Sequence, residues 1–172
     1  MITNKIQSNK KLIAIDIAKS FGSEFPLKSL DITPWLYKGL LLKEDLFREG
    51  INQHNWQEYQ KSYLCIEINK DALIAPWAYM LLVEKGKRYA RDIFFTNPLK
   101  AHVQLIKMNI DEADFSVYKE KYVLLKGCSN KSVTPEIYAY ITKKLIGIAK
   151  KIMYGEACSF VPVYIGQAEK QT

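Results

Sequence analysis

The sequence predicts an α/β fold: a single domain, residues 1–172, with a mostly parallel sheet built from two repeated strand-helix-strand units. Three observations support this prediction. Residues 56–97 align with residues 115–156 without a gap, so the second stretch repeats the first in a constant register. Short apolar runs alternate with helical patterns in both copies. A proline suited to the first turn of a helix occupies the same place in each copy, Pro76 and Pro135.

Each copy of the repeat has the same predicted elements. The first strand, residues 62–68 or 121–127, is a short run of apolar, aromatic and β-branched residues that ends at turn-forming residues. The helix that follows begins at the proline, with Thr134 as the expected N-cap of the second helix. A second strand, residues 92–95 or 151–154, closes the copy. Because a helix connects the two strands, we expect them to pair in parallel.

The remaining segments are less regular. Pro162 interrupts the last apolar run, which places that strand at the edge of a sheet. We predict a strand at residues 12–17, a turn into a short helix at 30–39, a helix at 43–53, a largely helical bridge at 97–119 and a last strand at 158–166.

Composition restricts the class of protein. The 172 residues are 48% hydrophobic and 25% charged, as is usual for a globular domain. No apolar run reaches the roughly 20 residues that a membrane-spanning helix needs, so we expect no membrane contact. Three widely spaced cysteines do not suggest a disulfide framework, which favours a reducing, cytoplasmic location.

The net charge of +7 raises the alternative of nucleic-acid or acidic-partner binding. The chain has no zinc-finger or RNP-like pattern, and cations near the end of a helix also complement its dipole. We therefore do not expect nucleic-acid binding on charge alone. The basic residues concerned are Lys85, Lys87, Arg88 and Arg91 in one predicted helix end, and Lys143, Lys144, Lys150 and Lys151 in the other.

The candidate site lies at the carboxyl edge of the predicted sheet, where open α/β sheets bind ligands. Cys128 and Cys158 each follow a predicted strand of the second copy, near the start of the helix at Pro135. A helix N-terminus attracts anions and thiolates. The candidate binding residues are Cys128, Ser129, Asn130, Thr134, Glu156 and Cys158, together with Asp71, the counterpart of Asn130 in the first copy.

Two interpretations of the cysteines stay open. They are a reactive or metal-binding pair, or they are small residues used for packing and turns, since cysteine is often buried as a hydrophobe. Both histidines, His54 and His102, lie outside the loops of this edge, which weakens a Cys–His mechanism. A zinc site takes four ligands as a rule, so we assign no metal, no cofactor and no catalytic residue.

Four segments resemble a bacterial family catalogued as domain of unknown function 2480: "SLDITPWLYKGLLLKEDLFRE", "DALIAPWAYMLL", "KGCSNKSVTPEIYAY" and "IMYGEACSFVPVY". The resemblance implies a compact intracellular protein without an assigned activity. It places a Gly-Cys-Ser motif on residues 127–129 and a Gly-Glu-Pro-Cys-Ser motif on residues 155–159, where Ala157 replaces the proline. It also implies a cysteine in the first copy, where this chain has Ile68 and Asn69. A site that needs a cysteine from both copies would be incomplete here.

Taken together, these observations predict a small-ligand-binding or regulatory module with a pocket near Cys128 and Cys158, acting as a homodimer. The alternatives are a cysteine-dependent enzyme or redox or metal-binding protein, and a nucleic-acid or acidic-partner binder. Whether the protein is an enzyme is left open.

Overall fold

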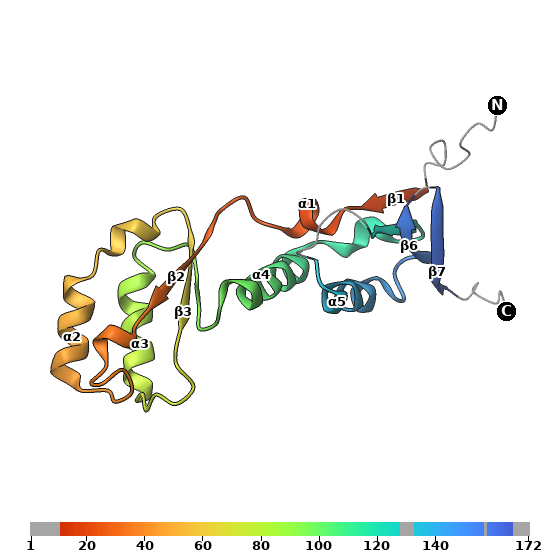
Figure 1. The fold of residues 1–172 in the computed structure, drawn as a ribbon. Helices are drawn as coiled ribbons and strands as arrows, with labels where there is room; N and C mark the ends of the chain where they lie inside the picture. Colours follow the sequence, from red (N-terminus) through yellow and green to blue (C-terminus); the bar gives the residue numbers. More distant parts are fainter. Residues whose placement is uncertain (1–10, 128–132, 157, 167–172) are drawn as a thin grey trace. The chain divides into compact units, whose positions relative to one another are not determined.

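The computed structural model describes residues 11–127, 133–156 and 158–166 (Figure 1). The chain divides into two compact units. Unit 1 comprises Met1–Ser23 and Val103–Thr172, and unit 2 comprises Glu24–His102. Unit 2 is therefore inserted in the sequence between the two segments of unit 1. The boundary between His102 and Val103 falls inside one long helix, α4, which spans Pro98–Glu112.

Unit 2 contains a three-stranded parallel sheet in the order β2-β3-β4, with helices in the connections. Leu27 pairs with Tyr63 at the start of β2 and β3. The elements are β2 (Leu27–Asp31), the 3-10 helix η1 (Thr33–Trp35), α2 (Glu44–Gln53), the 3-10 helix η2 (Trp56–Tyr59), β3 (Tyr63–Glu67), α3 (Pro76–Gly86) and β4 (Ile93–Phe94).

Unit 1 contains a four-stranded sheet in the order β1-β5-β6-β7. The first three strands are parallel, and β7 returns antiparallel to β6 as an edge strand that contains Pro162. Besides the second part of α4, the elements are β1 (Leu12–Ile15), α1 (Ile17–Phe21), the 3-10 helix η3 (Phe115–Tyr118), β5 (Tyr122–Lys126), α5 (Pro135–Leu145), β6 (Lys151–Glu156) and β7 (Ser159–Ile165).

The two units repeat one another beyond the predicted range. The helices η2 and η3 begin at equivalent positions of the aligned repeat, and so do β3 and β5, and α3 and α5. Lys61 and Glu120, which are also equivalent in this register, both have positive φ angles, +55° and +59°. Leu12 pairs with Tyr122 as Leu27 pairs with Tyr63, so β1 of unit 1 is the counterpart of β2 of unit 2.

Each unit also has a hydrophobic core of its own, built from equivalent positions. In unit 2, Phe47 and Ile51 of α2 pack with Leu64 and Ile66 of β3 and with Leu82 of α3. Since alternate residues of a strand point to the same face, α2 and α3 pack on one face of the sheet. The equivalent side chains of unit 1 are Ile106, Ile110, Val123, Leu125 and Ile141, and all of them are buried.

The structure confirms the α/β class, the mostly parallel pairing and the two strand-helix-strand units. It adds that each unit forms its own sheet. Strand β2 was not predicted, because Lys28, Ser29 and Asp31 give it little apolar character. The single domain of residues 1–172 remains a prediction. None of the helices in the described ranges combines the length and apolar character that a membrane crossing requires.

Candidate functional site

The predicted carboxyl edge of unit 1 is only partly within the described residues. Cys128, Ser129 and Asn130 lie outside them. Thr134 is the residue before α5, and Glu156 is the last residue of β6, opposite Ser159 of β7. Cys158 is an exposed residue of the turn between β6 and β7. Asp71 belongs to unit 2, where its backbone N–H donates to the side chain of Asn69 at 3.1 Å in an exposed turn.

The geometry of this edge is determined mainly by packing. Gly127 N–H donates to the carbonyl of Gly155 at 3.4 Å, so the ends of β5 and β6 are adjacent. Gly155 has a φ angle of +133°, and a Cβ there would lie 2.5 Å from a backbone oxygen. Tyr138 of α5 donates to the carbonyl of Lys126 at 2.8 Å and packs against Tyr154. Unit 2 has the equivalent aromatic pair, Tyr79 and Phe95, which marks this contact as part of the repeated architecture.

Thr134 behaves differently from its prediction. It holds the N-cap position of α5, but its side chain makes no capping hydrogen bond. Its Oγ1 atom is buried and has no hydrogen-bond partner among the described residues. A buried hydroxyl without a partner carries a desolvation penalty, so Oγ1 is available to another group.

The two described cysteines are chemically different. Cys158 is exposed and free, whereas Cys65 is fully buried in β3. Burial, together with the charge of Glu67, raises the pKa of the Cys65 thiol to about 11. Cys65 is therefore a core residue, and it is protonated at neutral pH.

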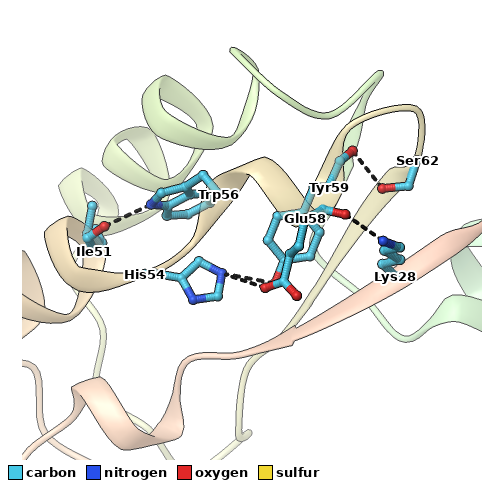
Figure 2. Close-up of polar contacts among 7 residues, drawn as sticks. All are labelled: Lys28, Ile51, His54, Trp56, Glu58, Tyr59 and Ser62. Carbon is cyan, nitrogen blue, oxygen red and sulfur yellow. Dashed lines mark hydrogen bonds and ion pairs between the residues drawn. The ribbon is translucent and has the colours of Figure 1, made fainter.

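Unit 2 contains a polar cluster that the sequence did not reveal (Figure 2). His54, which follows α2, lies with its Nε2 atom 3.1 Å from the hydroxyl of Tyr59 and 3.3 Å from Oε1 of Glu58. Its ring also makes edge contacts with Trp35 and Trp56, at centroid distances of 5.4 and 5.0 Å. The helix η2 brings Trp56, Glu58 and Tyr59 together, and the indole N–H of Trp56 donates to the carbonyl of Ile51 at 2.8 Å.

The position of Glu58 favours one of the two neutral tautomers of His54. A carboxylate beside Nε2 favours a proton on that atom, because a lone pair there would face the negative charge. Nε2–H then donates toward Glu58 and Tyr59, and the Tyr59 hydroxyl donates to Glu58. The other ring nitrogen, Nδ1, points away from both residues (Figure 2). In the neutral ring it is a hydrogen-bond acceptor.

Burial sets the charge of this cluster. It lowers the pKa of His54 below the ordinary value of 6.5, against a smaller raising effect of the Glu58 carboxylate. It also raises the pKa of Tyr59 far above its ordinary value, with the charge and hydrogen bond of Glu58 acting in the same direction. At neutral pH the imidazole is therefore neutral and the phenol is protonated.

A pocket of about 350 Å³ adjoins this cluster in unit 2. Its walls come from η1 and α2 and include Trp35, Glu49, Gly50, Gln53 and His54. Gly50 permits the close approach of η1 to α2, since a Cβ at this position would lie 2.4 Å from Cγ of Trp35. The side-chain amide of Gln53 donates to Oε1 of Glu49 at 2.9 Å.

The equivalent positions in unit 1 do not carry these side chains. In the register of the repeat, His54 and Glu58 correspond to Ala113 and Val117. In the register that relates β2 to β1, Trp35 corresponds to Ser20. Unit 1 forms the same fold without them, so the architecture does not require the His–Glu pair. This difference was available in the sequence, but the aligned repeat begins at residue 56, just after His54.

A second pocket of unit 2, of about 440 Å³, lies between α2 and α3 and is more apolar. Arg48 stacks over the ring of Trp77 at 5.5 Å, and Met80 is 72% exposed. Its charged lining residues are paired: Arg48 binds Glu44 at 2.9 Å, and Glu84 forms an ion pair with Arg88.

A family model describes nearly the whole chain: residues 1–165 match the protein family of unknown function DUF2480. The chain belongs to this family. The match confirms the resemblance carried by the four segments of the sequence. None of the curated proteins and none of the solved structures matches the chain significantly.

In this DUF2480 protein, several of the basic helix ends are paired with acids. Lys87 binds Asp92 at 2.9 Å, and Lys144 binds Asp111 at 2.6 Å. Arg88 forms an ion pair with Glu84. These contacts agree with the interpretation of the lysine-rich ends as solvated helix termini. Within the described ranges, no group of three or more His, Cys, Asp or Glu side chains is arranged to hold a metal ion.

Proposed function

We propose that this DUF2480 protein is a small-ligand-binding module whose binding site is the pocket between Trp35 and His54 in unit 2. One observation carries the proposal: the His54–Glu58 pair and Trp35 are present in unit 2, whereas the equivalent places in unit 1 hold Ala113, Val117 and Ser20. A concave site with an aromatic wall and a few convergent polar groups is the usual form of a small-molecule site.

The three tryptophans provide the test, because all of them lie in unit 2. Trp35 lines the proposed pocket and Trp77 lines the second pocket. The indole N–H of Trp56 donates to the carbonyl of Ile51 within unit 2. The protein is labelled with 5-fluorotryptophan and its three 19F resonances, assigned by single Trp→Phe variants, are followed during a screen of small molecules. The proposal expects a ligand that moves the Trp35 resonance and leaves Trp77 in place. A screen in which hits move only Trp77, or none of the three, would contradict it.

The second candidate site is the predicted carboxyl edge of unit 1, and the buried Oγ1 atom of Thr134 supports it. Here Thr134 precedes α5, Glu156 ends β6 and Cys158 follows in the turn to β7, while Cys128 lies in the sequence between β5 and α5. The cysteine-dependent alternative uses this edge. It expects a thiol that reacts with iodoacetamide faster than free cysteine at neutral pH, and loss of that reaction in a Cys128→Ser variant. Labelling at the rate of the free amino acid would argue against it.

We also propose a cytoplasmic homodimer. The support for a second copy is β7, an edge strand without a charged residue in a chain of net charge +7. Val161, Val163 and Ile165 on this strand are 63, 54 and 67% exposed. Native edge strands carry charge, proline or bulges that prevent pairing, and β7 has Pro162 but no charge. Light scattering should give twice the chain mass, and a Val161→Lys variant should be monomeric; a monomeric wild type would refute the dimer.

Nucleic-acid or acidic-partner binding through the lysine-rich helix ends remains an alternative proposal. It expects an affinity that falls steeply with salt concentration, because binding would release counterions. Binding that is absent at low salt would remove it.

A further inference from the structure

Besides the N–H of the Trp35 indole and the amide of Gln53, the polar groups that line the Trp35–His54 pocket are a carboxylate and an imidazole, which can both accept hydrogen bonds. Glu49 contributes a carboxylate, which is the single charged group among the described lining residues. His54 also lines the pocket, and with the proton on Nε2, beside Glu58 and Tyr59, the lone pair of its neutral ring is on Nδ1. Gln53 turns its amide nitrogen toward Glu49. No lysine or arginine is among the described residues that line this pocket, although the chain has 25 of them.

The aromatic wall of the pocket also favours a positively charged ligand. The indole of Trp35 lines the pocket, and indole rings attract cations through their electron-rich faces. Three aromatic neighbours hold the indole in place: its ring centroid lies 6.0 Å from Phe47 and 5.4 Å from His54 in edge-to-face contacts, and 6.3 Å from the tilted ring of Trp56. The close approach to Gly50 fixes it from the side of α2.

From these contacts, and on the basis of the proposed function above, we infer that the ligand of this pocket is a small organic cation, a primary amine or guanidine. Its N–H groups donate to Glu49 and to Nδ1 of His54, and its charge lies against Trp35. An anion would meet the Glu49 carboxylate and a lone pair. An apolar ligand would leave both acceptors desolvated without a partner, at a cost that hydrogen bonding would otherwise offset.

The test compares three probes of nearly the same size and shape: benzylamine, benzyl alcohol and benzoate. They are titrated into the full chain labelled with 5-fluorotryptophan. Benzylamine is expected to move the Trp35 resonance and to bind about tenfold more tightly than benzyl alcohol, the combined size of a cation–π contact and an ion pair at a partly exposed site. Benzoate is expected to bind more weakly than either.

Two variants on α2 separate the effect of charge from that of shape. Glu49→Gln removes the carboxylate of the pocket and should weaken benzylamine binding about threefold, as for an exposed ion pair, with no effect on benzyl alcohol. The matched control is Glu44→Gln, which removes a carboxylate of the second pocket on the same helix and should change neither affinity.

The outcomes distinguish the inference from the proposed function. If benzyl alcohol or benzoate moves Trp35 at least as strongly as benzylamine, the pocket binds ligands but the assignment of a cation is wrong. Equal effects of Glu49→Gln and Glu44→Gln would overturn it as well. If no probe moves Trp35, or if Trp77 alone responds, both the inference and the proposed site are refuted.

Discussion

A Gly50→Ala substitution tests whether the contact between η1 and α2 shapes the pocket. In most helix interiors, replacing glycine by alanine stabilises the fold by roughly 0.5–1 kcal/mol, because alanine loses less backbone entropy. Here the added Cβ would lie 2.4, 2.5 and 2.9 Å from three atoms of the Trp35 ring. Carbon atoms in contact prefer about 3.5–4.0 Å, so the ring must move.

The expected magnitude follows from these two effects. Overpacking costs about 1–3 kcal/mol, and the helix gain offsets roughly 0.5–1 kcal/mol of that. We therefore expect Gly50→Ala to lower the free energy of unfolding by about 1 kcal/mol, which reverses the usual sign. Urea unfolding followed by tryptophan fluorescence measures this, because the three tryptophans report on unit 2 alone.

A double-mutant cycle identifies Trp35 as the cause. In a Trp35→Ala background the obstructing ring is absent, and Gly50→Ala should then stabilise by about 0.5–1 kcal/mol. Trp56 and Trp77 still report the unfolding transition in that background. A stabilising Gly50→Ala in the wild-type chain, or the same effect in both backgrounds, would refute the proposed contact.

Three further predictions concern other groups. Because burial lowers the pKa of both His54 and His102, the unfolded chain binds more protons than the native one below pH 6.5. The free energy of unfolding should therefore fall as the pH drops through that value, and a His54→Asn variant should show a smaller fall; an unchanged pH profile would contradict this. Cys65 should resist iodoacetamide at neutral pH while exposed Cys158 is alkylated, as mass spectrometry of the native protein can show; rapid labelling of Cys65 would count against its raised pKa. Thr134→Val should change the stability measured by circular dichroism by less than the ~1 kcal/mol of a lost N-cap, since Oγ1 makes no capping bond; a full cap-sized loss would show that the hydroxyl has a partner.

The fold was largely predictable, because the repeat shows the sequence pattern of each strand and helix twice. The strands at Tyr63–Glu67 and Tyr122–Lys126 and the helices that begin at Pro76 and Pro135 follow from apolar runs and from proline at the first turn. β2 was missed because an edge strand can alternate with exposed polar residues. Its register with β3, compared with that of β1 and β5, shows that it is the counterpart of a strand that was predicted.

The division into two sheets was not predictable from the pattern of elements. A strand-helix-strand unit has the same sequence pattern whether the next unit adds strands to its sheet or forms a separate sheet. The separation depends on which strands pair. Here β1 pairs with β5 across the inserted unit 2, which is a long-range choice that local periodicity does not encode.

The candidate site was less predictable than the fold. The sequence placed the candidate site at Cys128 and Cys158, because both cysteines follow predicted strands and cysteine is a residue type with reactive side-chain chemistry. His54 and Glu58 have the ordinary spacing of polar residues on a surface. Their role depends on neighbours that are close only in the folded chain, above all Trp35, which precedes α2 in the sequence whereas His54 and Glu58 follow it. Comparing the two copies position by position is the signal that identifies them.

The cation-binding character of the pocket depends on which nitrogen of His54 carries the proton, and this can be measured directly. Two-bond 1H–15N NMR spectra of the full chain at neutral pH resolve the tautomer of each of its two histidines. We expect His54 to be neutral and protonated on Nε2, with Nδ1 as an acceptor, and we expect benzylamine to shift the Nδ1 resonance. A proton on Nδ1, or an imidazolium at neutral pH, would contradict this expectation, because the pocket would then present a donor to its ligand.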